Sequence, residues 1–287
     1  MARCTMDGRV LRIEGPGVLL VTSDLHGHLE DFRALVRLFE REDDAVLLSL
    51  GDLFHGPSVP AWVWETDYEH LGDYYADQSA QLFREFSALQ RRYPERVACL
   101  LGNHEHAHVG GPVLGKFHRD EAAAFEATLS PKDCALLRAF IEGLPWIAVS
   151  DAGVAFTHGA PPGTPFDPAL LQSAPLTGYE GYSLMEMYEA GFLAELLWRR
   201  TSRESEVAAF LEHLNAFPSQ PVCEWVTYGH DRVMEGYAIE HPRLLNLSTS
   251  FGMHRAQKTY LRLDLSERVQ RASDLEEGRH LLPLYPT

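Results

Sequence analysis

Short apolar runs, each followed directly by Asp, Asn or His, constrain the fold of this chain more than any other feature. The runs at 17–22 and 45–50 are separated by residues 29–39, whose apolar positions recur at helical spacing. This order predicts a β-α-β unit. Because continuous apolar strands are typical of sheets covered on both faces, the pattern predicts an α/β layered fold.

Five apolar runs end in residue types that bind metals or transfer protons. The residues at these ends are Asp24 and His26, Asp52, Asn103 and His104, His158, and His230. The carboxyl ends of neighbouring strands lie side by side, so these side chains are expected to converge on one crevice. Each motif alone also fits an ordinary turn or strand cap. Oxygen donors and imidazoles together suit two divalent cations, and the combined pattern favours a binuclear metal site.

The remainder of the chain continues the alternation of helices and strands. The spacing predicts helices near 77–92, 119–128, 131–142, 181–200 and 204–216, and strands at 97–101, 146–149, 153–157, 224–228, 236–240, 244–247 and 259–265. The sequence has no internal repeat and no low-complexity linker. We therefore expect one domain over residues 1–287, with an acidic, aromatic insertion at about 56–92.

Charge and cysteine usage exclude several classes of protein. The chain has 25 Lys and Arg against 41 Asp and Glu, a net charge of −16, which argues against nucleic acid or an anionic membrane as a partner. No apolar run is long enough to span a bilayer, and the N-terminal residues are charged where a signal peptide is apolar. The four cysteines have no metal-site or disulfide spacing. These features predict a soluble, cytoplasmic protein.

The five motifs, in this order, resemble the signature of the calcineurin-like metallophosphoesterases over residues 17–265. The bacterial-type branch of serine/threonine phosphoprotein phosphatases is the most similar. The matching strings are Asp24-Leu-His26-Gly27, LLGNHE at 100–105, His158-Gly159-Ala160, LLW at 196–198, and His230 followed by Gly236-Tyr237. The resemblance implies a β-sandwich flanked by helices, with the metal site at the carboxyl ends of strands.

The resemblance also implies roles for individual residues. Asp24, His26 and Asp52 would bind one ion, and Asp52 would bridge to a second ion bound by Asn103, His158 and His230. The ions would be Mn²⁺, with Fe or Zn as alternatives, and a hydroxide between them would attack phosphorus. His104 would be the general acid for the leaving oxygen; a supporting hydrogen-bond role is its alternative. The implied substrate is a phosphomonoester, with a phosphorylated protein as the partner.

One motif departs from the phosphatase pattern. Where those enzymes have GDxxDRG, this chain has His55 in place of the second Asp and Gly56 in place of the Arg. GDLFH resembles the form found in double-strand-break repair nucleases, where a histidine here partners the histidine of GNH(D/E). This opens a phosphodiesterase interpretation, which Asp231-Arg232 after His230 opposes, because the nucleases end in GHxH. A diadenosine-polyphosphate hydrolase, a cyclic-nucleotide hydrolase, a nuclease and an inactive scaffold remain alternatives.

Two further features concern substrate binding. A cation is needed for the phosphoryl oxygens, and we assign Arg200, with Arg199 and Arg203 as alternatives; a solvated basic helix end is the other interpretation. Residues 42–83 contain nine Asp or Glu and no Lys or Arg, together with several Trp and Tyr. We expect this segment to overhang the site and to disfavour polyanions, with a packed surface helix as the alternative.

Overall fold

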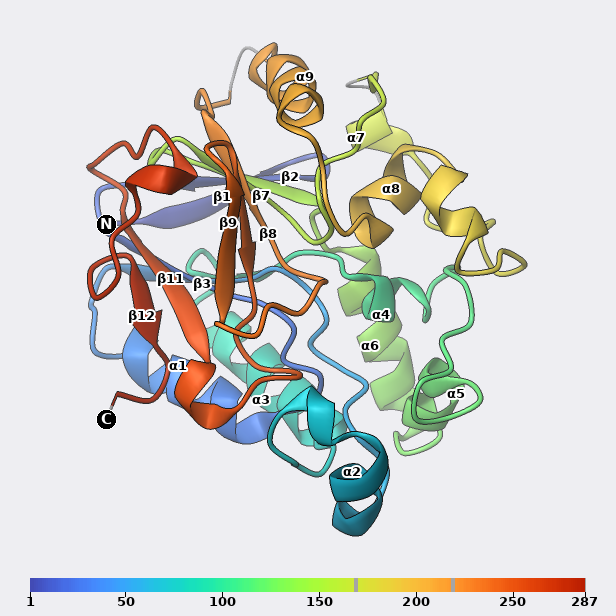
Figure 1. Cartoon of the computed structure of the whole chain (residues 1–287). Helices are drawn as coiled ribbons and strands as arrows, with labels where there is room; N and C mark the ends of the chain where they lie inside the picture. Colours follow the sequence, from blue (N-terminus) through green and yellow to red (C-terminus); the bar gives the residue numbers. More distant parts are fainter. Residues whose placement is uncertain (168–169, 218–219, 287) are drawn as a thin grey trace.

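Two mixed sheets form the centre of the computed structural model, which describes residues 1–167, 170–217 and 220–286. The strand order is β12-β11-β3-β4-β5 in a five-stranded sheet and β1-β2-β6-β7-β8-β10-β9 in a seven-stranded sheet (Figure 1). The strands are β1 (Arg3–Asp7), β2 (Val10–Glu14), β3 (Val18–Thr22), β4 (Ala45–Ser49), β5 (Val97–Cys99), β6 (Ile147–Ser150), β7 (Val154–Thr157), β8 (Trp225–Tyr228), β9 (Tyr237–His241), β10 (Leu244–Leu247), β11 (Thr259–Asp264) and β12 (Leu281–Pro283).

Helices occupy most of the connections between strands. They are α1 (Leu29–Phe39), α2 (Ala61–Asp67), α3 (Ser79–Arg92), α4 (Asn103–His106), α5 (Glu121–Glu126), α6 (Pro131–Glu142), α7 (Leu170–Ser173), α8 (Phe192–Trp198) and α9 (Glu204–Asn215), with 3-10 turns η1 (Glu69–Leu71), η2 (Glu186–Glu189), η3 (Arg255–Gln257) and η4 (Ala272–Asp274). Within the described ranges, no helix is both long and apolar enough to cross a membrane.

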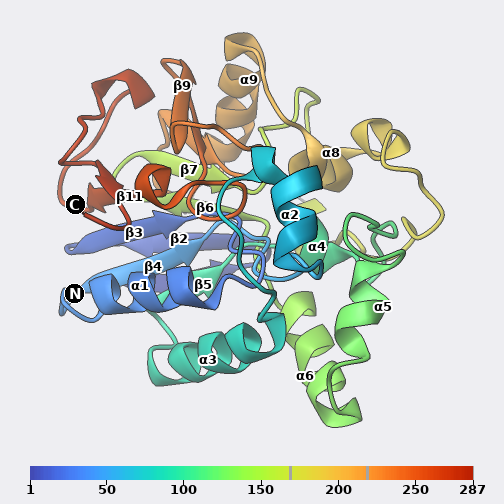
Figure 2. The same cartoon turned by 60° about the horizontal axis from the view of Figure 1, so that its bottom comes forward.

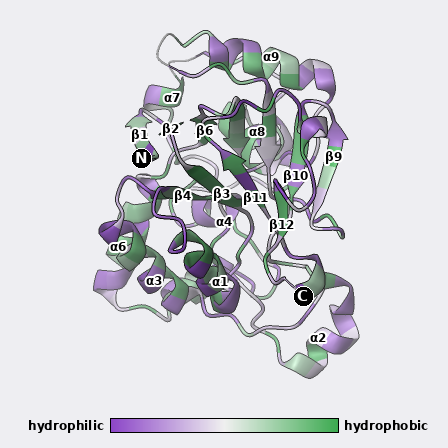
Figure 3. Ribbon diagram, turned by 90° about the vertical axis from the view of Figure 1, so that its left-hand side faces the viewer, coloured by the Kyte–Doolittle hydropathy of each residue, from purple (hydrophilic) through white to green (hydrophobic). Residues whose placement is uncertain are grey.

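The apolar runs form strands that are buried on both faces. In β3, Leu19 and Val21 belong to the core between the two sheets, whereas Val18 and Leu20 belong to the core under the helices. Successive strand residues point to opposite faces, so a run without polar residues satisfies both cores at once. Figure 3 shows the apolar strands at the centre and more polar helices around them.

Helices cover the outer face of each sheet. Helix α1 lies beside α3 and β4, and α9 packs on β8 (Figures 1 and 2). At the start of α1, the His28 side chain accepts a hydrogen bond from the backbone N–H of Asp31, which caps the helix. Leu29, Phe32 and Leu35 then form its buried face. The expected sandwich flanked by helices is confirmed.

Several elements differ from their sequence-based prediction. The helix expected over 181–200 is a 3-10 turn, η2, and the short helix α8, separated by Gly191 at φ 103°. A left-handed glycine ends one helical segment and starts the next. The β1–β2 hairpin lies outside the predicted elements, and its second strand pairs in parallel with β6.

The strand directions gather the motif-bearing ends. In the five-stranded sheet, β3, β4 and β5 run parallel to one another, and in the seven-stranded sheet β7 and β8 are parallel. The residues that follow these five strands therefore meet where the two sheets adjoin.

Candidate metal centre

The backbone at the strand ends is held in an unusual conformation. Among the described residues, five non-glycine positions have positive φ: Asp24, His26, Asp52, His55 and His230, at 52°, 42°, 54°, 69° and 66°. Left-handed backbone costs an ordinary residue roughly 1 to 2 kcal/mol, so it persists where the surrounding structure imposes it. All five were singled out as candidate site residues from the sequence.

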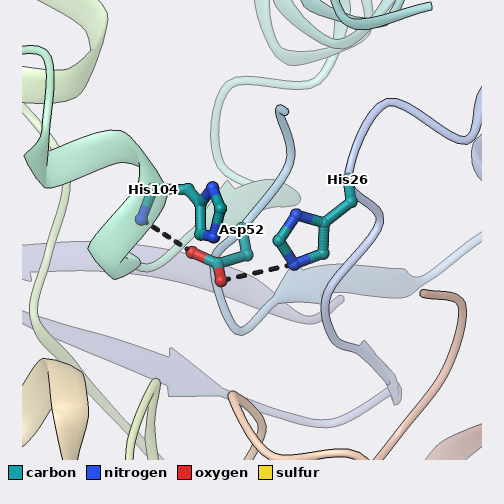
Figure 4. A group of neighbouring side chains, drawn as sticks. All are labelled: His26, Asp52 and His104. Carbon is teal, nitrogen blue, oxygen red and sulfur yellow. Dashed lines mark hydrogen bonds and ion pairs between the residues drawn. The ribbon is translucent and has the colours of Figure 1, made fainter. Parts of the chain in front are cut away.

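Asp24, His26 and Asp52 form the first half of the cluster. His26 Nε2 lies 3.9 Å from Asp24 Oδ1 and 3.5 Å from Asp52 Oδ2. The backbone N–H of His104 donates to Asp52 Oδ1 at 3.0 Å, which fixes the Asp52 carboxylate beside His26 (Figure 4). His26 Nδ1 lies 3.1 Å from the carbonyl oxygen of Phe54, which orients the ring.

Asn103, His158 and His230 form the second half, on the other side of Asp52. Asn103 Oδ1 lies 2.8 Å from His158 Nε2 and 3.1 Å from His230 Nδ1. His158 Nε2 is also 3.5 Å from Asp52 Oδ1, so Asp52 faces both halves. Ring nitrogens of His158 and His230 and a carboxylate oxygen of Asp52 lie within 4.8 Å of one another.

The chemistry of these atoms fits divalent cations. His26 Nδ1 and His158 Nδ1 each face a backbone carbonyl, so in the neutral rings these nitrogens carry the proton and Nε2 carries a lone pair. Those lone pairs face the carboxylate oxygens of Asp24 and Asp52, which are also acceptors. His230 Nε2 is buried without a hydrogen-bond partner. Acceptors that converge without a proton between them are suited to a cation.

The pKa shifts are consistent with this interpretation. Burial, with the charge of Lys116, lowers the pKa of His26 to about 3, and burial also lowers the pKa of His158. Both imidazoles are therefore neutral, as metal ligands must be. Burial and the neighbouring Asp52 carboxylate raise the pKa of Asp24 to about 7. Two buried carboxylates repel each other, and a bound cation removes that cost.

Glu105, the last residue of GNHE, holds the strand ends together. Its buried carboxylate accepts hydrogen bonds from the backbone N–H groups of Asp52 and Leu53, both at 2.8 Å, and from Gly102 at 3.1 Å. A Cβ on Gly102 would lie 2.3 Å from Asp52 Oδ1, so only glycine permits this approach. The motif was recognised from the sequence, but the role of its glutamate was not assigned.

His104 lies beside the cluster and contacts His55. Their Nδ1 atoms are 2.9 Å apart. The Oε2 atom of Glu121, 3.5 Å from His104 Nδ1, is buried and has no hydrogen-bond partner. His55 replaces the second Asp of GDxxDRG, yet the carboxylate of Glu121 still lies next to His104. Glu121 stands outside every recognised motif, and only its position at the start of α5 brings it here.

Three cations line the cavity of about 430 Å³ in front of the cluster: Lys116, Arg200 and Arg232. The Arg200 guanidinium forms an ion pair with Asp231. Lys116 Nζ lies over the ring of Phe251, 4.1 Å from its centroid. Arg199 and Arg203 instead form ion pairs with Glu206. Lys116 was not anticipated, because no motif surrounds it.

The segment predicted as an insertion contributes to the edge of this cavity. Leu71 lines it. The Tyr75 hydroxyl donates to the backbone carbonyl of His26 at 2.9 Å and so supports a candidate ligand. Trp64 is buried and packs on Phe117, whereas Trp62 is 69% exposed. The aromatic residues therefore divide between a packed core and the surface.

Carboxylates and imidazoles at the carboxyl ends of strands from two sheets are typical of metal-dependent hydrolases. The family model of the calcineurin-like phosphoesterases matches residues 17–233, more than half of the chain, and the chain belongs to this family. It is a hydrolase that acts on phosphoric ester bonds. No curated protein sequence matches the chain.

Solved structures show the same fold. A protein serine/threonine phosphatase from Saccharomyces cerevisiae, with similarity to the human phosphatase PP5, has a TM-score of 0.59 and 15% identity, over 87% of this chain and 73% of that one. A cold-active protein-tyrosine phosphatase of a psychrophilic Shewanella species has a TM-score of 0.56 and 16% identity, over 90% and 78%. At these identities, the similarity concerns the fold alone.

Proposed function

We propose that this protein is a phosphomonoesterase with two Mn²⁺ ions, acting on phosphoserine or phosphothreonine in proteins. The observation that carries the proposal is the position of Asp52 between two sets of ligand atoms, beside a cavity that also exposes His104 and three cations. Asp24 and His26 would bind one ion together with Asp52. Asn103, His158 and His230 would bind the other.

When bound, two such ions polarise phosphoryl oxygens and provide a hydroxide at neutral pH. The remaining tasks fall to the chain itself. His104 would donate a proton to the leaving oxygen, because it lies at the cavity next to Asp52. Arg200 would hold non-bridging oxygens. Lys116 is a second candidate for the same task, since its ammonium group faces the same cavity.

The substrate class is proposed from a smaller set of observations. The motifs resemble those of phosphoprotein phosphatases, and a serine/threonine phosphatase is among the similar folds. Glu65, Asp67 and Glu69 are exposed and shortly precede Leu71, which lines the cavity, so we place their negative charge on the approach to it. Negative charge there disfavours polyanionic substrates and favours a basic or uncharged phosphorylated segment.

One observation favours a second candidate, a phosphodiesterase. His55 contacts His104 directly, as the GDLFH resemblance to repair nucleases implies. Hydrolysis of a diester releases one alcohol, whose oxygen needs a proton just as the leaving oxygen of a monoester does. The His55–His104 pair therefore serves either reaction. A diadenosine-polyphosphate hydrolase falls within the same alternative.

A substrate panel tests the proposal. With Mn²⁺, purified protein is expected to cleave p-nitrophenyl phosphate and phosphoserine peptides faster than bis-p-nitrophenyl phosphate. The Asp52→Asn variant is the control for contaminating phosphatases. Cleavage of the diester but not of the monoester would favour the second candidate. If neither is cleaved and metal analysis finds less than one ion per chain, the protein is an inactive scaffold.

A further inference from the structure

A continuous line of hydrogen-bonded side chains runs from His104 away from the cavity. His104 Nδ1 lies 2.9 Å from His55 Nδ1, and His55 Nε2 lies 2.9 Å from His108 Nε2. His108 Nδ1 in turn lies 2.9 Å from Glu126 Oε1. Arg138 closes the line with two hydrogen bonds to the Glu126 carboxylate, at 3.0 and 2.7 Å. His55 and His108 are buried.

The carboxylate of Glu126 determines which atom donates in each hydrogen bond of the line. Burial alone would raise the pKa of Glu126, but hydrogen bonds from Arg138 and His108 outweigh burial and lower it. An ionised carboxylate only accepts hydrogen bonds, so the proton between His108 and Glu126 resides on His108 Nδ1.

Each neutral imidazole has one donor nitrogen and one acceptor nitrogen. The proton position on His108 therefore fixes the proton positions on His55 and then on His104. Burial lowers the pKa of His108, so that ring is neutral. His55 is also buried, and among the described residues its ring nitrogens contact only the two other imidazoles, so no carboxylate balances a positive charge on it and it stays neutral. His108 Nε2 is then the acceptor and His55 Nε2–H the donor. His55 Nδ1 accepts in turn from His104 Nδ1–H. Glu121 Oε2, at 3.5 Å from His104 Nδ1, favours the same proton position.

We propose that Glu126 and His108 are positioning residues that fix the tautomer and the ring orientation of His104 through His55. The proton on His104 Nδ1 is committed to the line, so Nε2 is the nitrogen that takes up a proton from solvent and then gives it to the leaving oxygen of a bound substrate, while the Nδ1–H stays in place. The value of this arrangement for catalysis rests on the proposed function, in which His104 is the general acid. The tautomer itself does not depend on that function.

Without the Glu126 carboxylate, the same hydrogen bonds can also form in the reverse direction, and only the longer contact with Glu121 opposes this. His108 Nε2–H would donate to His55 Nε2, His55 Nδ1–H would donate to His104 Nδ1, and the proton of His104 would move to Nε2. The direction therefore requires an acceptor-only group at the far end. The line joins α4 and the segment after it to the loop after β4, the end of α5 and α6, and none of the proposed metal ligands takes part in it.

Nitrogen NMR of the full chain labelled with ¹⁵N-histidine, in the presence of a chelator, tests this directly. Protonated and unprotonated ring nitrogens have well-separated shifts, and the His104 signals are assigned with His104→Asn. The native protein is expected to show a protonated Nδ1 and an unprotonated Nε2 at His104. His108→Phe is expected to produce a mixture of both tautomers.

His106→Phe is the matched control. His106 lies on the same segment, is also buried, and donates from Nε2 to the Leu176 carbonyl outside the line. It should leave the His104 tautomer unchanged. If His108→Phe does not fold, Glu126→Ala, at a less buried position, is expected to increase the Nε2–H tautomer of His104. An unchanged His104 in both Glu126→Ala and His108→Phe, or a native Nε2–H tautomer, would overturn the proposal.

Kinetics with Mn²⁺ add a second readout. A general acid matters most for poor leaving groups, so His108→Phe is expected to lower kcat about tenfold on phenyl phosphate and less than about twofold on p-nitrophenyl phosphate. Equal losses on both would contradict a positioning role. Inactive native protein with the expected tautomer would reject the proposed function but keep this inference. His55, His104 and Glu121 could also hold a metal ion. A third ion per chain, together with the absence of a proton on His104 Nδ1, would overturn the inference, because the metal would then occupy that nitrogen.

Discussion

Asp52 connects more parts of the site than any other side chain described above. Its carboxylate faces His26 on one side and His158 on the other, and its backbone N–H is held by Glu105. With 2% of its surface exposed, it has little water to solvate its charge. Its pKa is raised well above the usual range, chiefly by burial and then by Glu105. A cation is the natural partner for such a group.

Replacement of this residue tests whether one carboxylate serves two ions. Asp52→Asn is expected to lose both Mn²⁺ ions together, because the amide retains the shape but removes the shared charge. Metal analysis after dialysis against Mn²⁺ measures the stoichiometry. Asp67→Asn, an exposed carboxylate of α2, is the control and should retain the native content. Loss of one ion only would contradict the bridge.

The sequence predicted the site residues that belong to recognisable motifs, but not the site residues that lie outside them. Asp24, His158 and the other proposed ligands follow apolar runs, and the structure brings all of them together. Glu121, Lys116 and His108 reach the same region from the loop after α4 and from the start of α5. Their placement depends on how that segment folds back, which no local pattern specifies.

The short helix α4 acts as a clamp between strand ends. Glu105 lies at its third position and ties the residues after β4 to the residue before α4. A buried carboxylate that accepts three backbone N–H groups satisfies donors that have no other partner nearby. The helix has only four residues, Asn103–His106, so tertiary contacts rather than propensity maintain it.

Removal of this clamp is expected to affect both stability and metal binding. Glu105→Gln exchanges one acceptor oxygen for an amide donor that faces backbone N–H groups, which should lower the free energy of unfolding by about 2 kcal/mol. Displacement of Asp52 should weaken Mn²⁺ binding about tenfold. Urea unfolding and Mn²⁺ titration measure the two effects. Glu65→Gln, exposed on α2, should change neither; native values in Glu105→Gln would reject the clamp.

Element prediction succeeded where periodicity was strong. Helix α6 has the predicted bounds of 131–142, and α1 matches 29–39. Over 181–200 the composition is helical, but Gly191 interrupts the segment, so periodicity alone overestimated the helix. The β1–β2 hairpin is an edge of the seven-stranded sheet, with mixed burial that gives a weak signal.

The cavity contains positively charged groups although the whole molecule is acidic. The chain carries a net charge of −16, yet Lys116, Arg200 and Arg232 all line the cavity. Two bound divalent ions would outweigh the charges of Asp24 and Asp52 and add further positive charge. The surplus of acidic residues therefore affects how substrates approach, whereas the cavity determines what binds.

Buried histidines should make the metal-free protein sensitive to acid. Burial lowers the pKa of both His28 and His106 to about 4, whereas an unfolded histidine titrates near 6.5. Between these values the unfolded chain binds more protons, so the free energy of unfolding rises with pH. Asp24, with its pKa raised to about 7, has the opposite effect. Histidines with lowered pKa outnumber carboxylates with raised pKa, so the net slope is positive.

Urea unfolding in the presence of a chelator, at several pH values from 4 to 6.5, measures this slope. The free energy of unfolding should fall steadily as the pH is lowered through this range. His106→Phe removes one titrating group, so its slope should be shallower by up to one proton. A stability independent of pH, or one that increases toward pH 4, would contradict the expected sign.

The proposed ligands come from strands of both sheets: β3, β4 and β5 of one, and β7 and β8 of the other. Ions bound between them would join the two sheets, which also meet through a shared apolar core and through hydrogen bonds such as those of Ser23 with the Leu247 carbonyl and of His158 with the Leu50 carbonyl. Ion binding should then slow amide hydrogen exchange in both sheets to a similar degree, including strands remote from the cavity. Such a centre would act as a structural cross-link as well as a reactive one, and loss of its ions would make the two sheets open independently.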